Sequence, residues 1–200
     1  IVTIDGSAGA VQASALQFAN NGYVMRGDAL TLTRGAAPAG PVEVRVGDGG
    51  GASSGYTATV NNVLAGTDGL AKTGAGNLVL TRANTYSGGT WIRDGVLSVG
   101  ADDNLGAAGA TVTLDGGTLS VTGSGFSATP RTIALGASGG SFDIAQAGHR
   151  FVVANALTGP GSLVKRGVGT LVLNGAHGHT GGTSIEAGTL VVARNGALGT

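Results

Sequence analysis

The sequence contains no cysteine, only four prolines, and few charged or aromatic side chains. Without cysteine there is no disulfide framework and no thiolate that could bind a metal or act as a nucleophile. Charged residues make up 11% of the chain, and the 11 basic side chains cancel the 11 acidic ones. That balance lacks the positive charge on which nucleic-acid binding depends, so we expect no nucleic-acid partner. No apolar run approaches the roughly 18 residues of a membrane-spanning helix.

Glycine is what the sequence has in excess, with 40 of the 200 residues. Since no collagen-like Gly-x-y period is present, we expect the glycines to occupy turns that need a positive φ. Apolar residues make up 42% of the chain, which is enough to bury a core and argues against disorder. Aromatic residues are only 4%, so the core should consist of stacked Val, Leu, Ile and Ala.

A long internal repeat organises the chain. The segment Leu70 to Gly106 returns 93 residues later as Leu163 to Gly199, without a gap, and 17 of the 37 aligned positions are identical. The shared frame consists of alternating apolar residues, glycines and one lysine, at Lys72 and Lys165, which we expect to be exposed or stacked along a strand. Most other polar side chains differ between the copies. A chain that repeats its scaffold and varies its polar chemistry is typical of a structural role.

Short β-strand signals fill most of the chain. Each has three to five residues with apolar residues at alternating positions, bounded by Gly, Asn, Asp or Ser. Only residues 11–20 could form a turn or two of helix, although they also alternate. We expect strands at 29–33, 42–46, 56–60, 77–81, 90–93, 96–99, 111–114, 118–121, 132–135, 141–144, 151–153, 170–173, 183–185 and 189–192.

Strands this short must pair with something. The dipeptides Asp115-Gly116 and Asn174-Gly175 would suit hairpins, which leaves a meander or a sandwich open. A parallel β-helix accounts better for many short strands without helices, because each coil stacks its strands on the coil below. The 93-residue spacing then divides into four coils of about 23 residues. We predict an all-β parallel β-helix that runs as one segment over residues 1–200.

The repeated residues resemble a known family. Residues 70–90, closed by 95–99, look like the passenger-associated transport repeat of autotransporters, the type V secretion proteins of Gram-negative bacteria. Residues 163–183 resemble a second copy, with His177 and His179 where the family prefers Asn and Tyr. Residues 16–23 and 27–32 resemble the lead-in coils of the same proteins. The chain starts without an initiator Met and stops inside the second repeat, so we expect a piece of a longer passenger.

The resemblance implies a fold, a location and a partner. The fold would be a right-handed parallel β-helix, carried to the cell surface or released across the outer membrane. The partner would be the C-terminal β-barrel of the same polypeptide. In that family the repeat is associated with passenger folding and secretion, not with catalysis, so we expect no enzyme activity and no cofactor. The resemblance names no ligand, because passengers with similar stalks include adhesins, aggregation factors, proteases and esterases.

One tripeptide is a candidate binding site. Arg26, Gly27 and Asp28 match the integrin-recognition sequence of many matrix proteins, in which a glycine turn presents the guanidinium and the carboxylate. The alternative is an ordinary turn in front of a strand. We keep the three residues as the candidate contact with a host cell surface or matrix.

Other motifs do not carry chemistry. Residues 51–55 and 136–140 match Gly-x-Ser-x-Gly but lack the α/β context of a hydrolase. The glycines after Lys72 and Lys165 lack the order of a phosphate-binding loop. His177 and His179 could share one side of a strand, but no third metal ligand is evident.

Asp102 and Asp103 are adjacent, yet no carboxylate pair with the spacing of a glycosidase is evident. We therefore predict no catalytic residue and no metal site. A structural stalk is the first functional hypothesis. An adhesin or self-aggregation module that contacts host cells or neighbouring passengers is the second, and a carbohydrate-active enzyme is the third.

Overall fold

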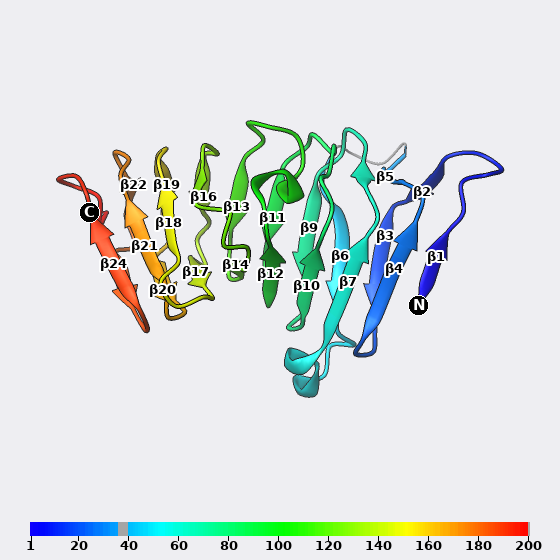
Figure 1. Cartoon of the computed structure of the whole chain (residues 1–200), viewed down its shortest axis with the longest axis horizontal. Coiled ribbons are helices and arrows are strands. Elements are labelled where there is room, and N and C mark those ends of the chain that lie inside the picture. Colours follow the sequence, from blue (N-terminus) through cyan, green and yellow to red (C-terminus); the bar gives the residue numbers. More distant parts are fainter. Residues whose placement is uncertain (36–39, 200) are drawn as a thin grey trace.

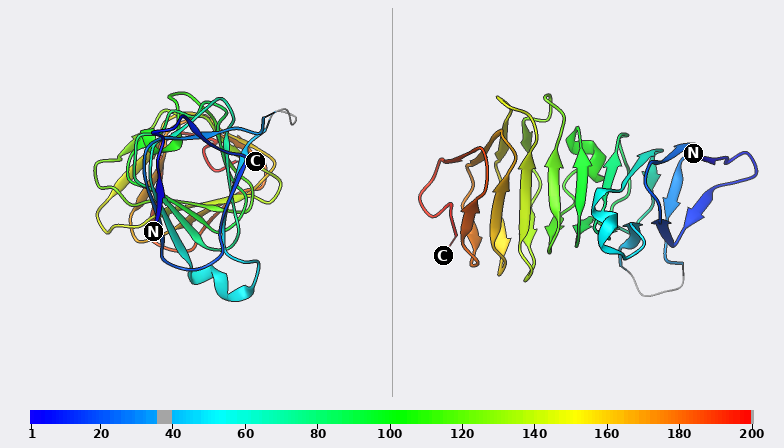
Figure 2. Two further views of the ribbon diagram at one scale, coloured as in Figure 1. Left: turned by 90° about the vertical axis from the view of Figure 1, so that its right-hand side faces the viewer. Right: turned by 90° about the horizontal axis from the view of Figure 1, so that it is seen from below.

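The protein is a β-solenoid with a parallel strand arrangement throughout. A computed structural model describes residues 1–35 and 40–199. Within these ranges every strand pairing is parallel. Successive coils lie side by side along the long axis, with the N and C ends at opposite ends of the solenoid (Figure 1). Seen end-on, the coils superimpose as a ring (Figure 2). The predicted parallel β-helix is confirmed, and the hairpin alternatives are not observed in the described residues.

Three sides make up each full coil. The nine-stranded sheet, whose nine strands mark eight turns, contains β1 (Val2–Ile4), β4 (Tyr23–Gly27), β7 (Thr57–Asn61), β10 (Asn77–Leu80), β12 (Val96–Val99), β14 (Thr118–Val121), β17 (Gly140–Ile144), β20 (Leu163–Arg166) and β23 (Thr183–Ile185). The eight-stranded sheet contains β3 (Ala15–Phe18), β6 (Val42–Val46), β9 (Leu70–Thr73), β11 (Thr90–Ile92), β13 (Val112–Leu114), β16 (Ile133–Leu135), β19 (Leu157–Gly159) and β22 (Gly178–His179).

The third side is formed by two smaller sheets. One contains β2 (Val11–Ala13), β5 (Leu30–Leu32) and β8 (Leu64–Ala65), and the other contains β15 (Ala128–Thr129), β18 (Arg150–Val153), β21 (Thr170–Leu173) and β24 (Thr189–Val192). Two short 3-10 helices, η1 (Gly51–Gly55) and η2 (Asp102–Leu105), interrupt the coils. No helix in the described residues is long and apolar enough to cross a membrane. Residues 11–20 form β2 and β3, so the helical turn considered there is wrong.

Alternating residues build the core because the strand register places apolar residues of one coil directly on apolar residues of the next. Leu80 pairs with Val60 on one side and Val99 on the other, and all three are at most 1% exposed. Each coil therefore buries its apolar residues against the coils above and below, and each buried CH₂ contributes about 0.8 kcal/mol. The backbone hydrogen bonds of the parallel ladders join the same coils.

Most of the predicted inward-facing residues are buried. The three exceptions, Ile185, Leu190 and Val192, lie in β23 and β24, the last strands of their sheets, where no described coil covers them. Ile185 is in register with the buried Lys165 on the neighbouring strand, so the side chain of Ile185 does point inward. The buried members are Leu78, Leu80, Ile92, Leu97, Val99, Leu171 and Leu173.

The two copies of the repeat lie on different sides of the solenoid. The first copy occupies β9 and β11 of the eight-stranded sheet and β10 and β12 of the nine-stranded sheet. The equivalent strands of the second copy are β20 and β23 of the nine-stranded sheet and β21 and β24 of the third side, and the second copy also contains the short β22 of the eight-stranded sheet. Four turns from Asn77 end at Val164, because each turn here takes 19 to 23 residues. The expected division of the 93-residue spacing into four coils is therefore wrong. The spacing corresponds to four full turns of the solenoid plus the step from one side of the coil to the next.

Repeated glycines stand where the corners of successive coils touch. Gly95 has a φ of 62°, and a Cβ there would lie 2.5 Å from the carbonyl oxygens of both Gly74 and Gly76. Gly188, its counterpart, has a φ of 70° and would meet the oxygens of Gly167 and Gly169 at 2.3 and 2.4 Å. No side chain fits at either position, so this glycine belongs to the frame of the repeat.

Candidate functional site

Of the two alternatives expected for the repeated lysine, the exposed side chain is wrong: in both copies it is buried on a strand and in register with an isoleucine of the next strand. Lys72 is fully buried, and its Nζ donates to the carbonyl oxygens of Thr73 at 2.9 Å, Gly74 at 2.6 Å and Asp94 at 3.0 Å. The first two acceptors belong to its own coil and the third to the next, so the ammonium group joins two coils at a corner. An ammonium group has three N–H donors, and all three are used.

Lys165 makes the same contacts in the second copy. Its Nζ donates to the carbonyl oxygens of Arg166 at 2.5 Å, Gly167 at 2.7 Å and Ala187 at 3.1 Å. Burial lowers the pKa of Lys72 to about 8, although the nearby Asp94 raises it. Burial also lowers the pKa of Lys165. The lysine is thus a coil-to-coil connector and not a ligand-binding group.

The two histidines of the second copy replace an amide and a phenol of the first. Asn84 accepts the backbone N–H of Leu64 through Oδ1 at 2.8 Å, and His177 accepts that of Leu157 through Nδ1 at 2.9 Å. The Tyr86 hydroxyl lies 2.7 Å from the Thr90 hydroxyl, and His179 Nε2 lies 3.0 Å from that of Thr183. Burial lowers the pKa of both His177 and His179. These imidazoles support the fold, and no group of three metal-ligating side chains occurs among the described residues.

The first copy ends in a turn held by an ion pair between a buried arginine and a partly exposed aspartate. Asp102 Oδ2 lies 3.0 Å from Arg131 Nε, and Asp102 Oδ1 accepts the Thr129 hydroxyl at 2.7 Å. Arg131 is 1% exposed and also donates to five backbone carbonyls, those of Asp102, Leu105, Gly106, Ala107 and Ala110. Asp102 is therefore committed to anchoring η2 on the following coil.

The Gly-x-Ser-x-Gly match at residues 51–55 is also structural. It forms η1, and Ser53 is 1% exposed with its hydroxyl donating to the carbonyl of Gly50 at 2.6 Å. No nucleophile elbow is formed because η1 is a 3-10 turn between β-strands, not the start of a long helix.

The structure places the Arg26–Asp28 tripeptide at an exposed corner. Arg26 and Gly27 are the last two residues of β4, where Arg26 pairs with Thr3 of β1, and Gly27 has a φ of 109°. Asp28 follows, and one of its carboxylate oxygens accepts the N–H of Gly6 at 2.8 Å. All three residues of the tripeptide are exposed. Recognition by a receptor remains a prediction for this corner.

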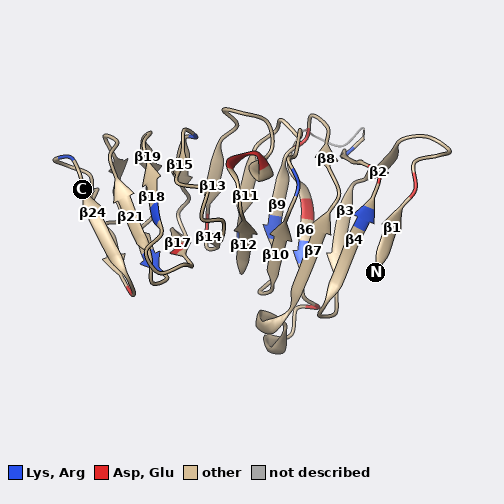
Figure 3. Cartoon of the chain, in the orientation of Figure 1, with Lys and Arg blue, Asp and Glu red and all other residues tan. Residues whose placement is uncertain are grey.

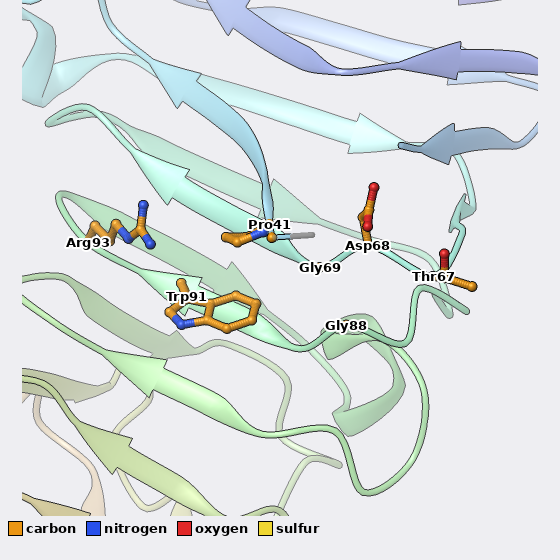
Figure 4. A pocket seen from close by; sticks show the side chains of 8 residues that line it. Pro41, Thr67, Asp68, Gly69, Gly88, Trp91 and Arg93 are labelled. Atoms are coloured by element: carbon orange, nitrogen blue, oxygen red, sulfur yellow. The ribbon is translucent and has the colours of Figure 1, made fainter. Parts of the chain in front are cut away.

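A groove that sequence analysis did not predict crosses the outer surface of the eight-stranded sheet. Trp91 of β11 lies beneath Pro41, which precedes β6, with Arg93 at one end and Asp68 at the other (Figure 4). The groove has a volume of about 470 Å³. The remaining lining residues are Gly40, Thr67, Gly69 and Gly88. Three segments from successive coils contribute to it, residues 40–41, 67–69 and 88–93, so only the coiling brings them together.

Charge is spread thinly over the whole solenoid. Lys and Arg segments alternate with Asp and Glu segments, separated by long uncharged stretches (Figure 3). Only two ion pairs occur in the described residues, Arg131 with Asp102 and Arg166 with Glu186. The second is exposed, so it contributes roughly 0–1 kcal/mol.

Comparison with known proteins agrees with the repeat. A family model described as passenger-associated-transport-repeat matches residues 70–99 and 163–192. Over 199 residues, 99% of this chain, the sequence is 44% identical to the Adhesin BmaC autotransporter of Brucella suis biovar 1 (strain 1330), of which it spans 6%. A stretch of 39 residues is 51% identical to the Extracellular serine protease of Serratia marcescens and covers 20% of this chain and 4% of that protein. No solved structure matches.

These similarities and the solenoid define the class. The chain is a passenger segment of an autotransporter and carries two passenger-associated transport repeats. Proteins of this class are displayed on, or released from, the surface of Gram-negative bacteria across the outer membrane. The chain spans only a small fraction of the length of the relatives that it matches.

Proposed function

We propose that this segment is a structural stalk of a longer passenger, which supports folding during secretion and presents loops. One observation carries the proposal: the polar side chains at the repeated positions are used in bonds within and between coils. The lysines join neighbouring coils, and Asn84 and His177 each accept a backbone N–H from a preceding coil. Each coil therefore offers the next both a backbone ladder and fixed polar contacts.

The expected partner is the C-terminal β-barrel of the same polypeptide. A solenoid that adds one coil at a time suits a chain that emerges gradually, because each new coil finds its pairing surface already formed. We also propose that the segment has no enzyme activity and needs no cofactor. In support, the relative that matches nearly the whole chain is named an adhesin. Asp102 and Asp103 are the two adjacent carboxylates of the sequence. The carboxylate of Asp102 is already engaged in an ion pair with Arg131.

The test uses the full-length passenger displayed on its own bacterium. Lys72→Met and Lys165→Met together should lower surface display several-fold, measured by flow cytometry on an N-terminal epitope, and should increase cleavage of surface-exposed passenger by added protease. Arg82→Met, which removes an exposed positive charge from the first copy, is the matched control. Normal display and normal protease resistance in the double variant would contradict the stalk role.

A second candidate function is adhesion, favoured by the name of the adhesin relative. The exposed Arg26, Gly27 and Asp28 are its candidate contacts with a host cell surface or matrix, and neighbouring passengers are a further candidate partner. Arg26→Ala is the cleaner variant, because the Asp28 carboxylate also accepts the N–H of Gly6. Saturable binding to cultured mammalian cells should fall in Arg26→Ala and persist in Arg82→Ala. Equal binding of both variants would contradict recognition through the tripeptide.

A further inference from the structure

We propose that the groove around Trp91 binds a neutral oligosaccharide. This inference goes beyond the stalk role and does not depend on the tripeptide at Arg26. It rests on the shape, the polar groups and the charge balance of the outer surface between β3 and β11.

Trp91 supplies a rigid aromatic platform. It points outward from β11, where its partners in the neighbouring strands are the small residues Ala71 and Thr113. The indole is held close against the preceding coil, since a Cβ at Gly69 would lie 2.5 Å from its Cζ3 atom. The side chain is still partly exposed and lines the groove (Figure 4). A fixed aromatic face suits the C–H face of a sugar ring, because the ring can stack at little entropic cost.

Two charged groups flank this platform with opposite hydrogen-bonding roles. The Asp68 carboxylate is fixed by one bond, in which Oδ2 accepts the backbone N–H of Arg34 at 2.6 Å. The Arg93 guanidinium makes no hydrogen bond or ion pair with any of the described residues. A carboxylate only accepts and a guanidinium only donates, whereas a sugar hydroxyl does both. The groove thus offers stacking, acceptors and donors within one recess.

The groove continues into a second depression. This one has a volume of about 290 Å³ and shares Pro41 and Arg93 with the first. It contains Glu43, whose carboxylate accepts the Thr73 hydroxyl at 2.6 Å. Its other lining residues are Ser14, Ala15, Arg34 and Ala71. The two depressions together have room for more than one sugar ring, so we infer an oligosaccharide and not a single monosaccharide.

The charge balance selects a neutral ligand. An anionic chain would meet the carboxylates of Asp68 and Glu43, and a cationic one would meet the guanidinium groups of Arg93 and Arg34. A neutral polyol pairs with both signs without repulsion. The two carboxylates of the recess, Asp68 and Glu43, line separate depressions, and each already accepts a hydrogen bond from the protein, Asp68 from the backbone N–H of Arg34 and Glu43 from the Thr73 hydroxyl. Neither depression alone contains the pair of carboxylates that glycoside hydrolysis requires. The inferred role is therefore binding without cleavage.

Only the first copy of the repeat can make this site. The positions equivalent to Trp91, Arg93 and Asp68, displaced by 93 residues, are Ser184, Glu186 and Gly161. The second copy keeps the frame and lacks the aromatic platform, the cation and the acceptor. The groove is thus an addition to the frame and not a part of it.

The chain's single tryptophan makes the experiment direct, because its intrinsic fluorescence reports on this groove alone. The folded protein is titrated with cellohexaose, maltohexaose, mannohexaose and chitohexaose as neutral probes. Hexagalacturonate, a chitosan hexamer and a proline decamer test the anionic, cationic and peptide alternatives. We expect a saturable change in Trp91 emission with at least one neutral hexasaccharide, and protection of Trp91 from iodide quenching at saturation.

Variants then assign the response to the groove. Asp68→Asn and Arg93→Gln should each weaken binding at least about fivefold, because each loses one charge-assisted hydrogen bond. Arg82→Gln removes the same charge from an exposed site elsewhere and should bind as the unmodified protein does. Trp91→Ala should abolish the heat of binding in calorimetry, with circular dichroism confirming that the variant is folded.

Three results would overturn the proposal: no response to any neutral probe, a response that Asp68→Asn and Arg93→Gln leave unchanged, or a stronger response to a charged probe or to the proline decamer. A failure of the stalk role is distinguishable from all of these, because it would appear in surface display and not in the titration of the folded protein.

Discussion

The first copy of the repeat, Leu70 to Gly106, and the second, Leu163 to Gly199, differ more in their surroundings than in their frame. Both bury a lysine that joins two coils, and both place a glycine at the same crowded corner. Yet they lie on different sides of the solenoid. The frame therefore encodes contact between one coil and the next, which does not depend on the side of the solenoid that carries it.

What surrounds the frame is free to differ. The first copy has an outward tryptophan and a turn anchored by Arg131, whereas Ser184 and Asn195 stand at the positions equivalent to Trp91 and Asp102. The second copy uses imidazoles where the first uses an amide and a phenol. The comparison separates the residues that hold coils together from those that decorate one copy, and the variants below test that separation.

The largest expected effect belongs to the anchor of the first copy. Arg131→Met removes an ion pair and the donor to five backbone carbonyls, of which those of Leu105 and Ala107 each keep one other donor, so it should lower the free energy of unfolding by about 3–5 kcal/mol. Urea denaturation followed by circular dichroism measures the loss. Arg150→Met, at an exposed arginine, should change stability by less than about 0.5 kcal/mol. A loss below about 1 kcal/mol in Arg131→Met would show that the turn is held by other contacts.

The shared lysine should matter nearly equally in both copies. Lys72→Met and Lys165→Met each leave three carbonyl oxygens without a donor inside the solenoid, and we expect a loss of about 2–4 kcal/mol for each. The same denaturation experiment provides the values, with Arg82→Met as the exposed control. If one variant loses stability and the other does not, the frame is not equivalent on the two sides of the solenoid, and the comparison fails.

Exchanging the variable residues should give an asymmetric result. Asn84→His should cost about 1–2 kcal/mol, because Asn84 Nδ2 donates to the carbonyl of Asn104 at 2.7 Å and that carbonyl would lose its donor. The reverse change, His177→Asn, should cost less than about 1 kcal/mol, since an amide oxygen can also accept the N–H of Leu157. Thermal unfolding of the two variants tests this difference. Equal losses would mean that the two positions are less alike than their hydrogen bonds indicate.

The solenoid could be predicted from the sequence because the pattern that indicates each strand lies within a few neighbouring residues. Alternating residues such as Leu78 and Leu80 indicate a strand that is half buried, and the copies show that the strands recur. Ten of the strands in the described residues were not predicted. For two of them, β9 and β20, the reason is clear: their inward positions carry Lys72 and Lys165, which break the apolar pattern. The rotation of the copies also escaped prediction, since the number of residues per turn varies and the spacing alone does not fix the side.

The groove could not be predicted for a different reason. Asp68 and Trp91 are separated by a full coil in sequence, and Pro41 lies one coil earlier still, so no motif links them. Their proximity follows only from the register that places β6, β9 and β11 side by side. The tripeptide at Arg26 was visible because its three residues are contiguous, and its role as a binding site stays a prediction.

The smallest expected effect is a difference in acid sensitivity between the copies. Burial lowers the pKa of His177 and His179, so the unfolded chain binds protons more tightly than the folded one. Their contribution to stability is complete above the ordinary histidine pKa of about 6.5 and is lost as the pH falls from there through the lowered values. The geometry agrees, because His177 Nδ1 accepts an N–H and His179 Nδ1 is buried without a partner among the described residues.

The exchange of these residues measures that effect against an internal reference. A variant with His177→Asn and His179→Tyr should lose less stability than the unmodified protein between pH 7 and pH 5, whereas Asn84→His with Tyr86→His should lose more. Urea midpoints at several pH values give both slopes, and carboxylates common to all three proteins cancel in the comparison. Parallel slopes would show that protonation of these imidazoles costs nothing in the folded state. In that case the second copy would tolerate acid as well as the first does. Its histidines would then have to be accessible to solvent, which is inconsistent with the burial that the structure shows.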